Sequence, residues 1–257
     1  MQNHFSFRRF SMLFQKHTSE HIKSYLMSLG VLLGILTLFI GGAAYAEDKP
    51  LTEMVQGALF VLFLFGVGTV FTSGVFANLG DKNKAIAFLV LPASHLEKYL
   101  VGWIYSFLLF LLVYIACFYL VDYVVLSMEA GGAEPRLLNV FSAEDGLYEA
   151  FLFYAFLHSL AIWGSAFFQK GHFIKTAFVF IVVMGILLVL NEQIMQLVWA
   201  RDINGAMPFA NITFKEGEEL AKVALPEAQQ SILSFIPLVL AAFFWAASYK
   251  LLQEKQV

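Results

Sequence analysis

The chain has 257 residues, of which 60% are hydrophobic and only 14% are charged, and its formal net charge is −3. Soluble domains carry about 25% charged residues, so a soluble fold of this length would leave much apolar surface in water. The small net charge argues against a nucleic-acid-binding protein. The single cysteine, Cys117, excludes an internal disulfide and a multi-cysteine metal site.

Six apolar stretches are long enough to cross a membrane as helices, since about 20 apolar residues span about 30 Å of hydrocarbon. Their apolar runs are continuous rather than alternating, which favours helices over barrel strands. We therefore expect an all-α polytopic fold, with one transmembrane domain over residues 1–257. The third run is long enough to tilt in the bilayer or to protrude from it. The six runs are residues 24–46, 55–79, 99–126, 148–168, 177–195 and 232–252.

The basic residues predict which side of the membrane each loop occupies. The two tails and the second and fourth loops hold 11 Lys and Arg residues, whereas the alternate loops hold 5. Cytoplasmic loops collect Lys and Arg, so both termini are expected in the cytoplasm. The Ala44-Tyr45-Ala46 sequence leaves a cleaved signal peptide as an alternative, although the polar stretch before the first run is unusually long for one.

The amino-terminal segment, residues 1–23, has an amphipathic pattern. Phe7, Phe10 and Phe14 recur at helical spacing, with Arg and Lys elsewhere around the helix. This pattern is typical of a helix that lies in the membrane interface. We expect an interfacial helix that leads into the first span.

The same segment contains the H-x-x-E-H pattern of inverted zinc proteases, formed by His17, Glu20 and His21. Two His four residues apart share one helix face. A hydrolytic zinc site also needs a third protein ligand, and none is evident in the sequence. We therefore expect no metal, no cofactor and no catalytic centre.

The second loop, residues 80–98, predicts two helices separated by a proline. Asp81 is a plausible N-cap for a short helix, which Pro92 ends. Ser94 and Glu97 then form the S-x-x-E capping-box pattern at the start of the third span. Such a short helix against a rigid span either transmits force from a bound partner or serves as a lipid-facing connector.

In this loop a basic, polar stretch leads to Leu89, Leu91, Pro92 and Ser94, and Lys98 follows shortly before the third span. At these positions the loop resembles that of the membrane permeases in type-2 ABC exporters, especially small bacterial ones. The order of six spans and the long outer segment before the last one, residues 196–231, extend the resemblance over most of the chain.

The resemblance implies that the loop contains a coupling helix that docks on a separate ABC ATPase subunit. Phe88 and Leu91 would be its apolar anchors, and Lys82 and Lys84 would meet partner charge or lipid headgroups. It also implies a second permease subunit, identical or related, and a location in the bacterial cytoplasmic membrane. The sequence has no G-x-x-x-x-G-K-[ST] phosphate loop, so ATP hydrolysis is expected on the partner. The alternative is a non-transporting six-helix scaffold or assembly factor.

Small and ionisable residues in the spans have several interpretations. Gly30 and Gly34 form a G-x-x-x-G pattern, which favours helix packing within one subunit over a dimer face. Asp122 and Glu192 lie near the outer ends of helices, where they can reach water. His158 lies in mid-span, where a hydrogen-bonded packing role is favoured over proton transfer.

The outer segment, residues 196–231, is too long for a simple turn. Residues 216–224 are expected to form a short helix that Pro226 ends. Pro237 is expected to kink the last span near its start.

Overall fold

The computed structural model describes residues 5–46, 51–129, 135–141, 147–199, 203–206, 212–216, 219–223 and 226–255. Helices dominate the described part of the chain, and the three strands form one small sheet. The elements in chain order are α1 (Phe7–Ala46), α2 (Glu53–Ser73), the 3-10 turn η1 (Ala77–Gly80), α3 (Lys82–Val90), α4 (His95–Trp103), the π-helical segment η2 (Ile104–Leu109), α5 (Phe110–Glu129), α6 (Leu147–Phe167), α7 (His172–Trp199), β1 (Ile203–Ala206), β2 (Ile212–Glu216), β3 (Glu219–Val223), α8 (Glu227–Leu233) and α9 (Ile236–Glu254).

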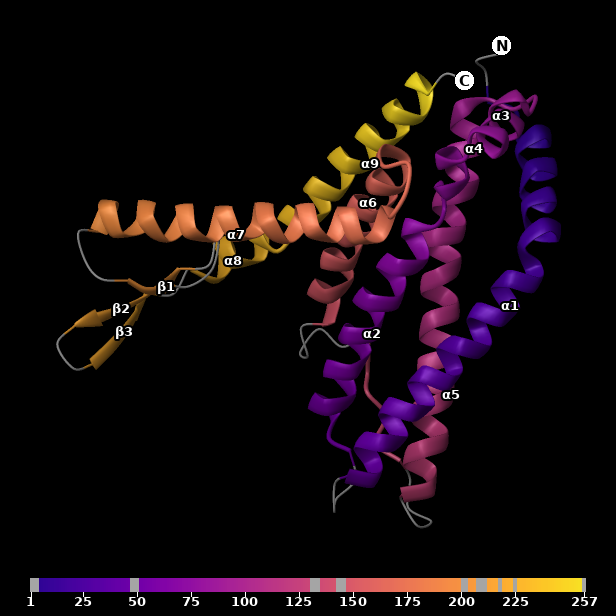
Figure 1. Ribbon diagram of the computed structural model, residues 1–257. Helices are drawn as coiled ribbons and strands as arrows, with labels where there is room; N and C mark the ends of the chain where they lie inside the picture. The colour runs from indigo at the N-terminus through magenta and orange to yellow at the C-terminus, as the bar shows by residue number, and fades with distance from the viewer. Residues whose placement is uncertain are drawn as a thin grey trace.

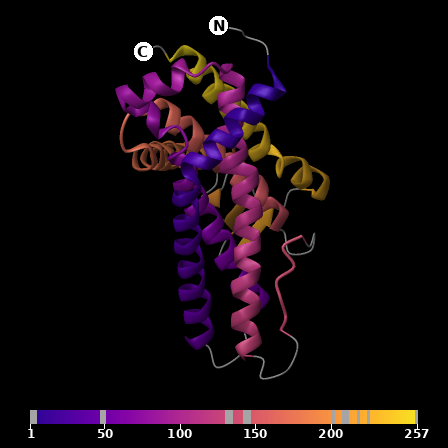
Figure 2. The same ribbon diagram turned by 90° about the vertical axis from the view of Figure 1, so that its right-hand side faces the viewer.

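Six helical segments are long and apolar enough to cross a membrane, which confirms the expected all-α, multi-pass membrane protein. Helices α1, α2 and α5 run side by side as a bundle (Figures 1 and 2). Helix α1 begins and α9 ends at the same end of the molecule, beside α3 and α4 (Figure 1). We call this end the basic end, because the predicted cytoplasmic loops lie there.

Helix α1 is one continuous helix of 40 residues, and Figure 2 shows its amino-terminal part turned away from the direction of the rest. At about 1.5 Å per residue it is roughly 60 Å long, twice the hydrocarbon thickness. The segment before Gly30 contains neither proline nor glycine, so nothing in it stops the helix. The expected amphipathic helix and the first span are therefore parts of one helix.

The third span is also longer than its apolar run. Segments α4, η2 and α5 follow one another without a gap from His95 to Glu129, a length of 35 residues. The prediction that this span exceeds the bilayer is consistent with that length. The π-helical turn within it was not predicted, and such turns are frequent at functional sites.

Helix α7 does not join the bundle. It extends across α6 and away from the other spans (Figures 1 and 2). None of its most apolar stretch is buried within the chain, and side chains such as Ile181 and Leu197 are 67% and 83% exposed. An apolar helix of this kind requires lipid or another protein around it.

The segment after α7 differs from its predicted form. Instead of a helix over residues 216–224, the described residues form an antiparallel sheet in the order β1-β2-β3, with Ile212 opposite Val223 and Glu216 opposite Glu219. β-branched and aromatic residues in these strands favour extended backbone. A two-residue Gly217-Glu218 interval is also a hairpin signal in the sequence. Pro237 does not kink the last span, because it lies in the first turn of α9, where proline is tolerated.

The core of the bundle is aromatic and closely packed. Phe60, Tyr114 and Phe118 are completely buried, and the Tyr114 hydroxyl donates to the Phe60 carbonyl at 2.7 Å. Gly68 is required here, because a Cβ at that position would lie 2.5 Å from Cε2 of Tyr154.

Gly30 and Gly34, in contrast, lie where the described part of the chain leaves open space beside the helix. Both are exposed, and a Cβ at either position would meet no described atom within 4 Å. The prediction that these two glycines pack against another helix of the same subunit is therefore wrong. Their face of α1 is open to lipid or to a second subunit.

Polar groups inside the bundle are joined in a network around His158. Trp245 Nε1 donates to Nδ1 of His158 at 3.0 Å, and the other ring nitrogen lies 2.9 Å from the Ser106 hydroxyl. Ser106 donates in turn to the Gly102 carbonyl at 2.8 Å. Because the indole N–H can only donate, Nδ1 accepts and Nε2 carries the hydrogen of a neutral imidazole. This hydrogen-bonded arrangement confirms the packing role predicted for His158.

The other two ionisable residues differ from each other. Asp122 is completely buried, and its carboxylate oxygens have no hydrogen-bond partner among the described residues. Its predicted access to water is therefore wrong. Glu192, near the far end of α7, is exposed as expected.

Candidate functional site

Helix α3 projects from the basic end as a short helix with defined ends. The Asp81 carboxylate accepts hydrogen bonds from the backbone N–H groups of Asn83 and Lys84, at 3.0 and 3.2 Å. These bonds satisfy two of the unpaired donors at the start of the helix. The helix ends at Val90, and Leu91 is extended, as the residue before Pro92 should be. Both predicted boundaries of the short helix are confirmed.

The start of α4 carries the predicted capping box. The Ser94 hydroxyl accepts from the Glu97 N–H at 3.2 Å, and the Glu97 carboxylate accepts from the Ser94 N–H at 2.9 Å. Both residues are buried, and Glu97 is 0% exposed. The capping box therefore fixes the first turn of the third span directly after Pro92.

The same carboxylate also holds the start of α1. Glu97 accepts a hydrogen bond from the Ser6 N–H at 2.7 Å and forms an ion pair with Arg9 at 2.9 Å. Sequence reasoning missed this contact because the partners are about 90 positions apart. The capping-box pattern predicted that Glu97 accepts a backbone hydrogen bond, but no local pattern indicated Arg9 as its partner. The buried charge is satisfied by four donor groups, as a buried carboxylate requires.

The apolar side chains of α3 point in two directions. Phe88 and Leu91 are half-buried, and Phe88 packs against Phe76 with ring centroids 6.4 Å apart. Ile86 and Val90 are exposed, Val90 by 70%. These two residues are four positions apart and share one helix face. The outward apolar surface of the short helix is thus formed by Ile86 and Val90.

The remaining predicted coupling residues are distributed around this helix. Lys84 and Pro92 are exposed, whereas Lys98 is 2% exposed and its ammonium lies 5.7 Å from the centre of the Phe88 ring. That distance permits a cation–π contact, which joins α4 to α3. The side chains of Lys82 and Leu89 lie outside the described part of the structure.

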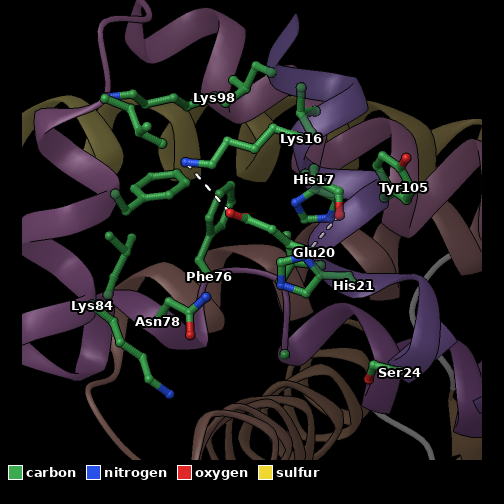
Figure 3. Close-up of a pocket in the computed structure, with 18 of the residues that line it drawn as sticks. Lys16, His17, Glu20, His21, Ser24, Phe76, Asn78, Lys84, Lys98 and Tyr105 are labelled. Atoms are coloured by element: carbon green, nitrogen blue, oxygen red, sulfur yellow. Dashed lines mark hydrogen bonds and ion pairs between the residues drawn. The ribbon is translucent and has the colours of Figure 1, made fainter. Parts of the chain in front are cut away.

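A cavity of about 550 Å³ lies between α3 and residues 13–28 of α1 (Figure 3). Its walls come from α1, the end of α2 with η1, α3, and the start of the third span. The ionisable and hydrogen-bonding lining residues are Lys16, His17, Glu20, His21, Ser24, Tyr25, Ser28, Asn78, Lys84, Lys98 and Tyr105. Sequence reasoning did not bring these residues together, because they lie on four separate segments.

The H-x-x-E-H residues lie on one wall of this cavity. The rings of His17 and His21 stack with centroids 4.4 Å apart, and His17 Nε2 lies 2.7 Å from the Tyr25 hydroxyl. His21 Nδ1 donates to the His17 carbonyl, and Glu20 pairs with Lys16. Among the described residues no group of three potential metal ligands occurs.

The π-helical turn connects the cavity to the interior of the bundle. Tyr105 packs on His17 and Tyr25, with ring centroids 4.5 and 5.4 Å away, and its hydroxyl is hydrogen-bonded to Thr18. The next residue, Ser106, belongs to the His158 network. One turn of the third span thus contacts both the α1 wall of the cavity and the buried polar network.

Comparisons with known proteins identify no relative: no family model, curated protein or solved structure matches the chain.

Proposed function

We propose that the chain is the permease subunit of an ATP-driven ABC exporter in the bacterial cytoplasmic membrane. The observation that supports this most directly is α3, a capped helix at the basic end with Ile86 and Val90 exposed on one face. A soluble partner with an apolar groove would cover these two side chains. The sequence resemblance of residues 80–98 to exporter permeases gives that partner its class, an ABC ATPase.

A displacement of α3 would be transmitted to the spans through a short linker and several side-chain contacts. Only four residues separate the last residue of α3 from the first of α4. Phe88 packs on Phe76, Lys98 lies over Phe88, and Glu97 ties the start of α4 to α1. Because each of these contacts is buried or half-buried, a displaced α3 has to carry α4 and the start of α1 with it. The π-helical turn then lies in the path from α4 into the bundle.

The partner ATPase supplies the hydrolysis in this proposal, since the chain has no phosphate loop. A second permease subunit completes the transport path. The exposed apolar surface of α7 and the open face of α1 around Gly30 and Gly34 are available for that subunit.

The test is recovery of an ATPase with the tagged chain, purified in mild detergent from cells that express it naturally. Mass spectrometry should identify a phosphate-loop ATPase, and the preparation should hydrolyse ATP. The variant Val90→Asp places a charge on the docking face and should reduce the bound ATPase at least tenfold. Phe88→Asp is less suitable, because Phe88 also packs within the chain.

The matched control is Met12→Asp on α1, where an exposed apolar side chain at the same end receives the same charge. It should keep the ATPase bound. Retention of the ATPase by Val90→Asp would remove the coupling role of α3. Purification of wild-type chain without any ATPase would favour the scaffold or assembly factor.

A further inference from the structure

We propose that the cavity between α1 and α3 binds the phosphate-bearing headgroup of an anionic membrane lipid. The site needs no ATPase, so it can be tested separately from the coupling role of α3.

The cavity has a positive balance of fixed charge. Three lysines line it, Lys16, Lys84 and Lys98, against one carboxylate, Glu20. Lys16 and Glu20 form an ion pair at 3.8 Å, and both side chains are about half exposed. Such a pair is weak, so the Lys16 ammonium remains available to a stronger anion. Figure 3 shows Lys16 reaching into the cavity from α1, with Lys84 on the opposite side.

The polar lining has the donors that a phosphate group requires. Lysine ammonium groups bind phosphate as point charges. The hydroxyls of Ser24 and Ser28 and the amide of Asn78 add hydrogen-bonding groups around them. A volume of about 550 Å³ suits a headgroup, since ligand pockets range over about 300–1,000 Å³.

The apolar part of the lining favours an amphiphile over a free anion. Phe71, Val75 and Val101 line the cavity on the side of α2 and the third span. The α1 face that bears Ser24 and Ser28 continues toward the membrane at Val31, which is 57% exposed. An acyl chain attached to a headgroup in the cavity can therefore lie along α1.

The position of the cavity agrees with this assignment. Its lining residues belong to α1, α3, η1 and the start of the third span, and α3 and α4 lie at the basic end (Figure 1). Basic pockets between transmembrane helices near the membrane surface are suited to anionic lipid headgroups. A lipid bound here would touch both α1 and α3, and would brace the short helix against the first span.

The experiment is native mass spectrometry of the full chain in a nonionic detergent, titrated with phosphatidylglycerol or phosphatidylcholine of the same acyl chains. Both lipids carry one phosphodiester, but only the first has a net negative charge. Phosphatidylglycerol should occupy one saturable site with at least fivefold preference. The double variant Lys16→Gln/Lys84→Gln should weaken this site by roughly fivefold for each lysine removed.

The matched control is Lys23→Gln/Lys170→Gln, which removes the same charge from exposed positions outside the cavity. It should leave the affinity unchanged. Equal binding of the two lipids, or equal losses in the two double variants, would overturn the proposal. Competition between phosphatidylglycerol and glycerol 3-phosphate shows whether the cavity prefers a lipid headgroup or a soluble phosphate compound. Displacement of the lipid at equal concentration would overturn the lipid assignment in favour of a soluble phosphate compound.

Discussion

The guanidinium of Arg9, in the first turn of α1, lies 2.9 Å from a carboxylate oxygen of Glu97, which is completely buried at the start of α4. The same carboxylate closes the capping box with Ser94. One side chain therefore fixes the start of the third span and the start of the first. Because α3 is joined to α4 through Pro92, the Glu97 carboxylate anchors the segment that carries α3.

This anchor predicts a strong coupling between two positions that are 88 residues apart. Arg9→Gln should destabilise the protein by about 1.5–3 kcal/mol, because it removes charged hydrogen bonds from a buried carboxylate. Glu97→Gln should also be destabilising, and the double variant should cost less than the sum of the two. Thermal unfolding in detergent, followed by tryptophan fluorescence, measures this. Additive effects would contradict the buried pair, and Arg8→Gln is the control on the same turn.

The His158 network predicts that a hydrogen-bond acceptor matters more than ring shape at this position. His158→Phe leaves the Trp245 indole N–H without an acceptor and should cost about 1–3 kcal/mol. His158→Asn retains a side-chain oxygen that can accept a hydrogen bond, so it should cost less. The thermal midpoints of both variants in the same detergent decide this. Equal or reversed losses would show that the network contributes little.

Two glycines in neighbouring spans predict opposite responses to alanine. Gly68→Ala should destabilise the protein by about 1–3 kcal/mol, because its Cβ would clash with the completely buried Tyr154. Gly34→Ala should be neutral or slightly stabilising, because it meets no described atom and alanine favours helix. Unfolding midpoints of the two variants give the comparison. A larger loss from Gly34→Ala would mean that the open face of α1 is packed in the protein as purified.

If the proposed function is right, a second subunit is expected to cover the exposed face of α7 in the membrane. Leu187→Cys, in a Cys117→Ser background, should form a bismaleimide cross-link to an identical or related chain in native membranes. Leu187 is 49% exposed on α7, and Leu120→Cys, 59% exposed on α5, is the control. Mass spectrometry identifies the cross-linked product. Cross-linking from Leu120 but not from Leu187 would leave α7 facing lipid.

The parts of the fold predicted correctly depend on local sequence. Apolar runs gave the six spans, and their lengths required helices. Asp81, Pro92 and the Ser94–Glu97 pair act within one turn of their own positions, so the boundaries of α3 and the start of α4 could be predicted. The strands after α7 were missed, although the Gly217-Glu218 interval was a usable signal.

The candidate site depended on contacts between distant segments. Phe88 and Val90 are equally apolar in the sequence, yet the first packs inward and the second is exposed. Gly34 belongs to a packing motif, yet a Cβ there would meet no described atom within 4 Å, whereas a Cβ on Gly68 would meet Tyr154 and Phe110. Neither difference can be obtained from spacing, because it depends on which helix lies opposite.

The sequence by itself determined that the chain is a membrane protein with several apolar helices, and where most of those helices begin and end. Hydrophobic length and capping residues are local properties, and they act before any two helices meet. Only the tertiary structure decided that Arg9 meets Glu97, that α1 runs unbroken past the cavity, and that Ile86 and Val90 remain exposed. Those outcomes depend on how segments far apart in the chain pack together. A buried charge or ring is satisfied only by a residue that the fold brings next to it.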